Sequence, residues 1–381
     1  NVFVGTGEHS GTYLEGSNVR IRAERDGYAN VRITQSISES TPAMRIIELE
    51  PRPIEGDYHI ADSPIIGEIL RFGNVFVAVS ADGRLIGFES GGAVSWVNET
   101  ANTENRNNQP VAAAGRVVLT GGIEMVVNDP QSGSELVQRS LPSSDNHMFG
   151  RRVVPFPGGL LFPRNRGIDL VSLETGETYE EIAIPRAAGM TPGYYDEIII
   201  MCNQRGDMFF YNESGEMIGE VETPADQIRA LSPVVHEGRV YLANRKGLVV
   251  CVDLDSRSLV WDRDVDPDAN MQVFHDLVVT DYGIFMYDLR HNIVYALNTE
   301  NGQELYPPIQ NVSCPPGVAG GELLYGTMTD DFIIAEADTG RDVSSLNVDA
   351  NVVTRPSVYE GRILVGTDNG RVLVINPAGL E

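Results

Sequence analysis

Cysteine is scarce in this chain of 381 residues, and no two of its three cysteines are neighbours. Their wide separation excludes C-x-x-C pairs, and their odd number argues against a framework of disulfides. Because a free cysteine usually behaves as a small apolar side chain, we expect all three to be buried and inert. They are Cys202, Cys251 and Cys314.

Metal-binding and catalytic motifs are also missing. The six histidines are scattered, and no two have the spacing of a zinc site. The sequence contains neither a G-x-S-x-G elbow nor a phosphate-binding loop. Aspartates alternate over residues 262–268, but Pro267 interrupts them and no glycine or glutamate completes a calcium loop. We therefore expect no catalytic residue and no bound metal.

Long apolar runs and positive charge are in short supply. No stretch approaches 18 apolar residues, so we expect no membrane span. The net charge is −26 and the isoelectric point is about 4.5, which argues against nucleic acids and anionic membranes as partners. Lys246 is the single lysine among 28 basic residues.

What the chain does contain is a repeat with spacings of five, nine and nine residues. In the clearest copy, Pro233 is followed by Gly238, Gly247 and Ser256. Successive copies begin 39 to 45 residues apart, which indicates one supersecondary unit repeated along the chain. The central markers of the eight copies are Gly83, Glu124, Gly167, Gly206, Gly247, Asn292, Asp331 and Gly370.

Each repeat reads as an antiparallel meander. Short runs rich in β-branched and aliphatic residues, such as 239–243 and 248–252, are typical of strands. Turns such as Asn369-Gly370 supply the positive φ angles of tight hairpins. Four strands per unit and eight units predict an all-β fold, an eight-bladed β-propeller of four-stranded blades.

The last copy lacks room for a fourth strand, because only two residues follow Gly379. We expect an N-terminal strand to complete this blade, since an unpaired edge would be a liability. Residues 44–50 are the predicted closing strand, within a propeller that extends over residues 41–381. Residues 1–40 are predicted to form a small β module with strands at 18–23 and 29–34; it resembles PEGA-type modules.

The repeat resembles that of the pyrroloquinoline-quinone (PQQ)-like propellers. The resemblance is carried by residues 238–254 with Trp261, by 294–302 and by 361–376, and it extends over roughly residues 65–381. The family's outer-strand tryptophan occurs in two copies only, as Trp96 and Trp261.

The resemblance implies the non-catalytic branch of this family. Its quinone-dependent enzymes hold PQQ between a tryptophan and a disulfide of adjacent cysteines, and this sequence has no adjacent cysteines. We therefore expect no cofactor and no enzymatic activity, and a PQQ-dependent dehydrogenase is the least favoured function.

The non-catalytic branch is exemplified by a lipoprotein that assists outer-membrane β-barrel assembly. That resemblance implies a monomeric interaction scaffold in the bacterial periplasm or at the cell surface, with a protein partner and a lipid anchor in a segment before Asn1. A sensor that binds a small ligand or glycan in the central channel remains the alternative.

Basic side chains recur in the predicted turns between the second and third strands of copies three to six. These turns lie on the same face of a propeller as the connections between blades. We predict that this basic arc binds an acidic partner, although turns are polar in any case. The predicted partner-binding residues are Phe149, Arg151, Arg152, Arg164, Arg166, Arg205, Arg245, Lys246, Arg290 and His291.

Overall fold

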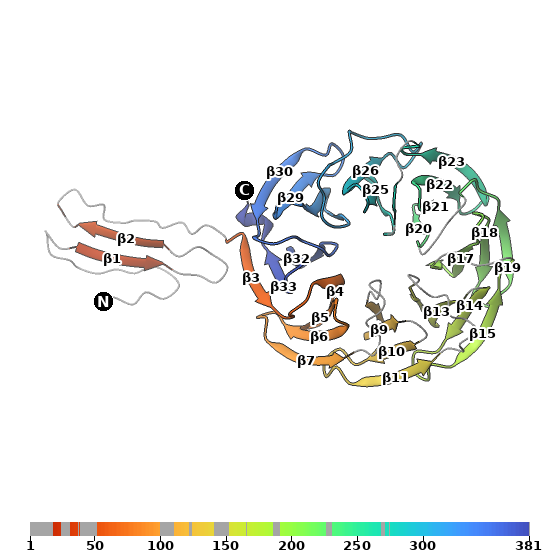
Figure 1. Cartoon of the computed structure of the whole chain (residues 1–381), viewed down its shortest axis with the longest axis horizontal. Coiled ribbons are helices and arrows are strands. Elements are labelled where there is room, and N and C mark those ends of the chain that lie inside the picture. Colours follow the sequence, from red (N-terminus) through yellow and green to blue (C-terminus); the bar gives the residue numbers. More distant parts are fainter. Residues whose placement is uncertain are drawn as a thin grey trace.

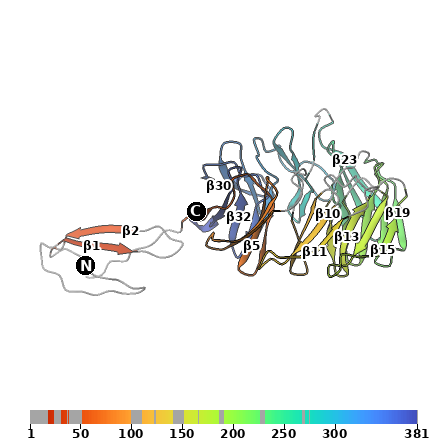
Figure 2. The same ribbon diagram turned by 60° about the horizontal axis from the view of Figure 1, so that its bottom comes forward.

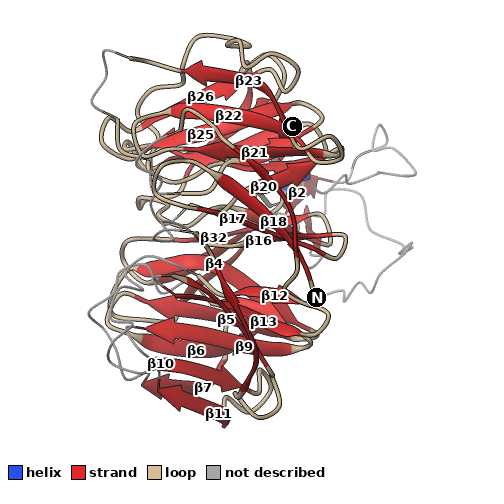
Figure 3. Cartoon of the chain, turned by 90° about the vertical axis from the view of Figure 1, so that its right-hand side faces the viewer, coloured by secondary structure: helices blue, strands red, loops and turns tan. Residues whose placement is uncertain are grey.

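The protein is a ring of eight β-sheet blades, which confirms the predicted all-β propeller (Figure 1). Figure 3 shows the same blades from the side, with almost no helix among the strands. The computed structural model describes residues 18–23, 31–36, 38, 52–99, 110–121, 124–140, 152–164, 166–185, 191–225, 231–267, 271–273 and 275–380. In this described part of the chain, no helix has the length and apolar character that a membrane span requires.

Strands of one blade follow one another in the chain, from the innermost to the outermost. Blades one to four comprise β4 (Ile65–Phe72), β5 (Val75–Ser80), β6 (Arg84–Glu89) and β7 (Val94–Glu99); β8 (Val111–Ala113), β9 (Arg116–Gly121), β10 (Glu124–Asn128) and β11 (Glu135–Ser140); β12 (Val154–Phe156), β13 (Gly159–Arg164), β14 (Gly167–Val171) and β15 (Thr178–Ala183); β16 (Gly193–Tyr195), β17 (Ile198–Cys202), β18 (Met208–Asn212) and β19 (Met217–Val221).

The second half of the ring repeats this order. Blades five to eight comprise β20 (Val234–His236), β21 (Arg239–Ala243), β22 (Leu248–Asp253) and β23 (Ser258–Asp264); β24 (Val278–Thr280), β25 (Gly283–Asp288) and β26 (Ile293–Leu297); β27 (Gly317–Ala319), β28 (Glu322–Gly326), β29 (Asp331–Glu336) and β30 (Asp342–Asn347); β31 (Ser357–Tyr359), β32 (Arg362–Gly366) and β33 (Arg371–Ile375), with β3 (Ile54–His59) outermost in the eighth. A short 3-10 helix, η2 (Pro377–Gly379), follows β33.

Turn chemistry explains why the repeat has its spacing. Gly247 and Gly370 have φ angles of 97° and 80°, and each directly precedes the third strand of its blade. In the seventh blade this role falls to Asp330, with φ 63°, rather than to the predicted Asp331, which begins β29. The left-handed residue has to sit in the turn itself, because the next residue already pairs in the sheet.

Prolines mark the entry to the blades. Pro233 and Pro356 lie immediately before β20 and β31. Pro316 also lies immediately before its strand, β27. A residue without an N–H group is suited to this position because it makes no demand on the ladder.

The sixth blade has an irregular outer edge. Its regular sheet has three strands, and the outer position is taken by residues 304–309 through isolated bridges from Val294 to Ile309 and from Leu297 to Glu304. Pro307 and Pro308 lie in this segment and cannot donate to a ladder. The outer segment is therefore paired only at its ends.

The ring closes through β3, and not through the predicted segment 44–50, which lies outside the described residues. β3 pairs antiparallel with β33, from Ile54 opposite Ile375 to His59 opposite Arg371. Ion pairs from Arg362 to Glu55 and from Arg371 to Asp57, the latter at 2.8 Å, support the pairing. The observed closing strand, β3, carries two acidic side chains, whereas the prediction is based on a more apolar segment.

Outer-strand aromatic side chains join each of several blades to the next. The Trp96 indole packs on Gly133 and donates to the Pro130 carbonyl at 3.0 Å, and Trp261 packs on Gly302 in the same way. Both tryptophans are in outer strands, as predicted. Tyr58 of β3 contacts Gly92 of the first blade and donates to the Ser90 carbonyl at 2.9 Å. The seam is therefore fastened in the same way as the two tryptophan junctions.

β1 (Asn18–Ala23) and β2 (Val31–Ser36) form a separate two-stranded sheet. Figure 2 shows them outside the ring. The first strand is where the sequence predicts it, and the second begins two residues later than predicted. Whether residues 1–40 form a complete module stays a prediction.

Shortening the chain tests the closure. A chain that begins at Arg52 should unfold at the temperature of the full-length chain. One that begins at Ile60 should have a Tm lower by about 5 °C or more, because it loses the β3 ladder and two ion pairs. Calorimetry of both chains measures this. An equal loss in the two would assign the closure to the segment before Arg52 instead.

Candidate functional site

The candidate site lies on the face of the propeller that carries the inter-blade connections, here called the connecting face. Neighbouring strands of a blade run antiparallel. The turn between the second and third strands therefore lies on the same face as the connection that enters the first strand. The turns between first and second strands, and between third and fourth, lie on the opposite face.

Several residues of the predicted basic arc are exposed on the connecting face. Arg166, Arg205 and Lys246 are exposed in the turns of blades three, four and five, and Arg290 is exposed in that of blade six. Arg245 is partly buried. The arrangement across consecutive blades agrees with the predicted positions, and its role in binding stays a prediction.

Other members of the arc pair with carboxylates of their own blade. Arg164 forms ion pairs with Asp169 at 2.7 Å and with Glu181 at 3.0 Å, both in its own blade. The ring of His291 lies 2.5 Å from the buried carboxylate of Asp288. These contacts reduce the positive charge that the face presents to a partner.

Arg152 is drawn inward, and two predicted residues fall outside the described part of the chain. The guanidinium of Arg152 pairs with Asp276, and burial lowers the pKa of Arg152 to about 10, with Arg355 adding to this effect. Phe149 and Arg151 lie outside the described residues.

Polar residues converge around the propeller axis at one repeated position. In blades three to six and in blade eight, the residue two places before the first strand is polar or charged and contacts another residue at this position. We call these residues the axial network. They are Arg152, Thr191, Ser232, Asp276 and Arg355.

Asp276 is the centre of the axial network. Its carboxylate pairs with Arg152, from a connection three blades away, and accepts a hydrogen bond from the Ser232 backbone N–H at 2.6 Å. Its carbonyl accepts a hydrogen bond from Arg355 at 2.9 Å. One residue thus joins connections from opposite parts of the ring.

The network extends through two further contacts. Arg355 lies 3.5 Å from Glu68 of β4, and the Arg152 N–H donates to the Thr191 hydroxyl at 3.1 Å. Two arginines and two carboxylates are therefore balanced within the network. Charged side chains that are largely removed from water, as those of Arg152 and Asp276 are, require compensation of this kind.

His275 sits beside these charges without carrying one. Desolvation and the guanidinium groups of Arg355 and Arg152 lower the pKa of His275 to about 3. Its ring contacts that of Tyr287, with centroids 5.8 Å apart. At neutral pH the imidazole is uncharged.

The axial network was not predicted from the sequence, although a signal exists. Thr191, Ser232 and Arg355 each directly precede one of the repeat prolines. A polar residue at this one position of successive repeats marks the axis, because the position leads into every innermost strand. Asp276 is not followed by a proline, so the sequence indicates its position only through the spacing of the repeats.

The residues present do not fit a PQQ site. All three cysteines are free and buried, as predicted, so no disulfide lies near the axis. Both tryptophans lie in outer strands, where they join neighbouring blades. The clamp that holds the quinone in PQQ enzymes therefore has no counterpart.

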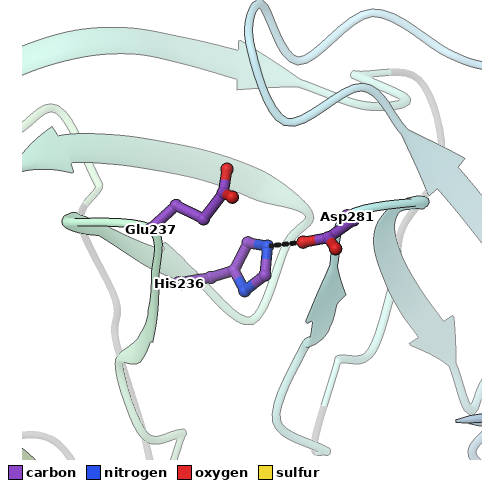
Figure 4. Close-up of side chains that lie close together, drawn as sticks. All are labelled: His236, Glu237 and Asp281. Atoms are coloured by element: carbon purple, nitrogen blue, oxygen red, sulfur yellow. Dashed lines mark ion pairs between the residues drawn. The ribbon is translucent and has the colours of Figure 1, made fainter.

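The histidine spacing predicted no metal site, yet the fold brings three potential ligands together. His236, Glu237 and Asp281 lie on the opposite face, at the first turns of blades five and six (Figure 4). Sequence spacing could not indicate this cluster, because its members come from two blades.

Comparison with known proteins identifies similar sequences. The family model described as outer membrane protein assembly factor BamB matches residues 60–166, 204–313 and 290–379. BamB of Salmonella typhimurium is 25% identical over 213 residues, which cover 55% of this chain and 52% of the relative. BamB of Yersinia pestis is 28% identical over 163 residues, covering 39% of this chain and 42% of the relative. The chain thus spans about half the length of the first of these relatives, and less of the second.

Solved structures share the fold. The crystal structure of BamB from Moraxella catarrhalis has a TM-score of 0.65 and 13% identity, covering 85% of this chain and 99% of that one. The computationally designed Ika8 protein has a TM-score of 0.67 and 16% identity, covering 84% and 98%. At these identities the likeness concerns the fold alone.

Removal of one partner tests the axial network. Arg152→Met should lower the free energy of unfolding by about 2–3 kcal/mol, because it leaves the largely buried Asp276 carboxylate without its main partner. Arg152→Met combined with Asp276→Leu should lose less. Denaturant unfolding measures both. As a control, Arg166→Met on the exposed turn should change stability by about 0.5 kcal/mol or less, and an equal effect at Arg152 would contradict the network.

Acid tests the state of His275. The unfolded chain binds a proton at this histidine near pH 6.5 and the folded chain only near pH 3, so stability is lost as the pH falls between these values. The loss reaches about 1.4 kcal/mol per pH unit. Between pH 7.5 and pH 5, His275→Gln should therefore lose about 2 kcal/mol less than wild type.

Denaturant unfolding at both pH values measures this difference. The control variant His59→Gln changes an exposed histidine and should lose as much stability in acid as wild type. If His275→Gln kept the full acid sensitivity of wild type, the histidine would not be buried in its neutral form.

Proposed function

Because this chain belongs to the family of outer membrane protein assembly factor BamB, we propose that it is a non-enzymatic scaffold of the bacterial cell envelope. The scaffold binds a protein partner through the connecting face of the propeller. Its relatives are named as assembly factors for outer membrane proteins, and the partner of this chain is a component of the same kind of assembly.

The exposed cations of the connecting face carry the proposal. Arg166, Arg205 and Lys246 project from turns of three consecutive blades, on a chain whose net charge is −26. A local positive surface attracts an acidic segment even on a protein whose net charge is negative. Arginine adds bidentate contacts to carboxylates.

The axial network supports binding on the face rather than along the axis. A small ligand or glycan entering beside Asp276 would have to compete with Arg152 and Arg355 for that residue's carboxylate and carbonyl. Separation of buried partners of opposite charge is costly. The alternative of a sensor that uses the central channel is therefore less well supported.

Charge reversal tests the connecting face. The double variant Arg205→Glu with Lys246→Glu should bind its envelope partner about tenfold more weakly, because it replaces attraction to an acidic segment by repulsion. Capture from a solubilised envelope fraction, with mass spectrometry to identify outer membrane assembly components, finds the partner. Titration of the purified partner then gives the affinity.

A control with the same change in net charge separates a local effect from a global one. Arg263 is exposed on the outer strand β23, and Arg341 follows the turn between the third and fourth strands of blade seven, away from the connecting face. Arg263→Glu with Arg341→Glu should retain wild-type affinity. Equal losses in the two double variants would rule out this face as the binding surface.

A further inference from the structure

The cluster of His236, Glu237 and Asp281 joins two blades on the face away from the connecting face. His236 is the last residue of β20 and Glu237 lies in the turn that follows it, whereas Asp281 lies in the corresponding turn of the next blade. Figure 4 shows the imidazole and the two carboxylates turned toward the space between the blades.

The spacing of these groups suits one metal ion. The His236 Nε2 lies 2.9 Å from a carboxylate oxygen of Asp281, and one ligand atom from each of the three residues lies within 4.8 Å of the others. A zinc ion bound at about 2.0–2.2 Å reaches ligand atoms up to about 4.4 Å apart. Glu237 and Asp281 are exposed, so small rotations of their side chains bring all three atoms into range.

The junction between blades eight and one has a different arrangement at the corresponding place. There Glu360, in the first turn of blade eight, lies 3.5 Å from the guanidinium of Arg71 in the following blade. The same guanidinium stacks on the Tyr359 ring, 3.1 Å from its centroid. A cation from the next blade thus meets the acidic turn residue.

At the junction of blades five and six, the following blade contributes a carboxylate in place of a cation. Glu237 corresponds to Glu360 and His236 to Tyr359, and Asp281 comes from the turn that follows the strand end corresponding to Arg71. Two carboxylates therefore face each other beside a nitrogen ligand. A bound cation would supply the charge that Arg71 supplies at the other junction.

We propose that His236, Glu237 and Asp281 bind a divalent transition-metal ion, and that Zn²⁺ fits best. A neutral imidazole combined with carboxylates suits Zn²⁺, whereas Mg²⁺ and Ca²⁺ prefer ligand sets made of oxygen alone. Water completes the coordination, because three protein ligands leave the fourth position open. The ion links blades five and six, and the inference does not depend on the proposed function.

Zinc titration of the full chain tests the site. Calorimetry and elemental analysis should find one Zn²⁺ per chain at pH 7.5, with a rise in Tm on addition of ZnCl₂. MgCl₂ at the same concentration should leave the Tm unchanged.

Variants identify the ligands. His236→Ala and Asp281→Asn should each weaken Zn²⁺ binding at least tenfold, and the isosteric Glu237→Gln should weaken it without disturbing the fold, as checked by circular dichroism. His291→Ala is the matched control, because His291 also pairs with an aspartate but belongs to no such three-ligand group among the described residues. Unchanged zinc affinity and stoichiometry in His236→Ala, or equal stabilisation by Mg²⁺, would overturn the proposal.

Discussion

The packing of an outer-strand side chain onto a left-handed turn of the next blade holds the ring together. Trp96 lies against Gly133 and Trp261 against Gly302, and both glycines have positive φ angles. A Cβ atom at Gly133 would come within 2.4 Å of the indole, so the contact requires both the unusual backbone and the missing side chain. Because each blade is a sheet with two apolar faces, it is stable only between two neighbours. The first and last blades must therefore also contact each other, so the stability of the ring depends on the closing strand β3 as well as on the blade interiors.

The sequence predicted those parts of the fold that depend on local chemistry. Tight turns require a positive φ angle, so Gly247 and Gly370 mark them in any context and reveal the blade number and strand order. The closing strand β3 depends instead on pairing with a distant strand. Its acidic residues pair with Arg362 and Arg371 of the eighth blade, and a local sequence pattern cannot predict such distant partners. Its aromatic residue, Tyr58, is the one feature that it shares with the outer strands β7 and β23, which carry Trp96 and Trp261.

The candidate site was predictable in its exposed part and not in its interior. Turn positions place Arg205 and Lys246 on one face without knowledge of any contact. The sequence cannot say which arginines are compensated, because Arg152 and Asp276 meet only when connections from distant blades converge. The charged residues of the connecting face therefore fall into two groups. Charges near the axis contact one another, while turn residues farther out, such as Arg205 and Lys246, are exposed.

The seam also determines how the protein responds to a pull. The chain enters the ring through β3 and leaves it after β33, and these two strands are paired in a single blade. A force applied to the segment before Arg52 therefore acts first on this antiparallel ladder, on its two arginine contacts and on the Tyr58 contact with the first blade. Tension at this point would load the closure of the ring before it loads the interior of any other blade.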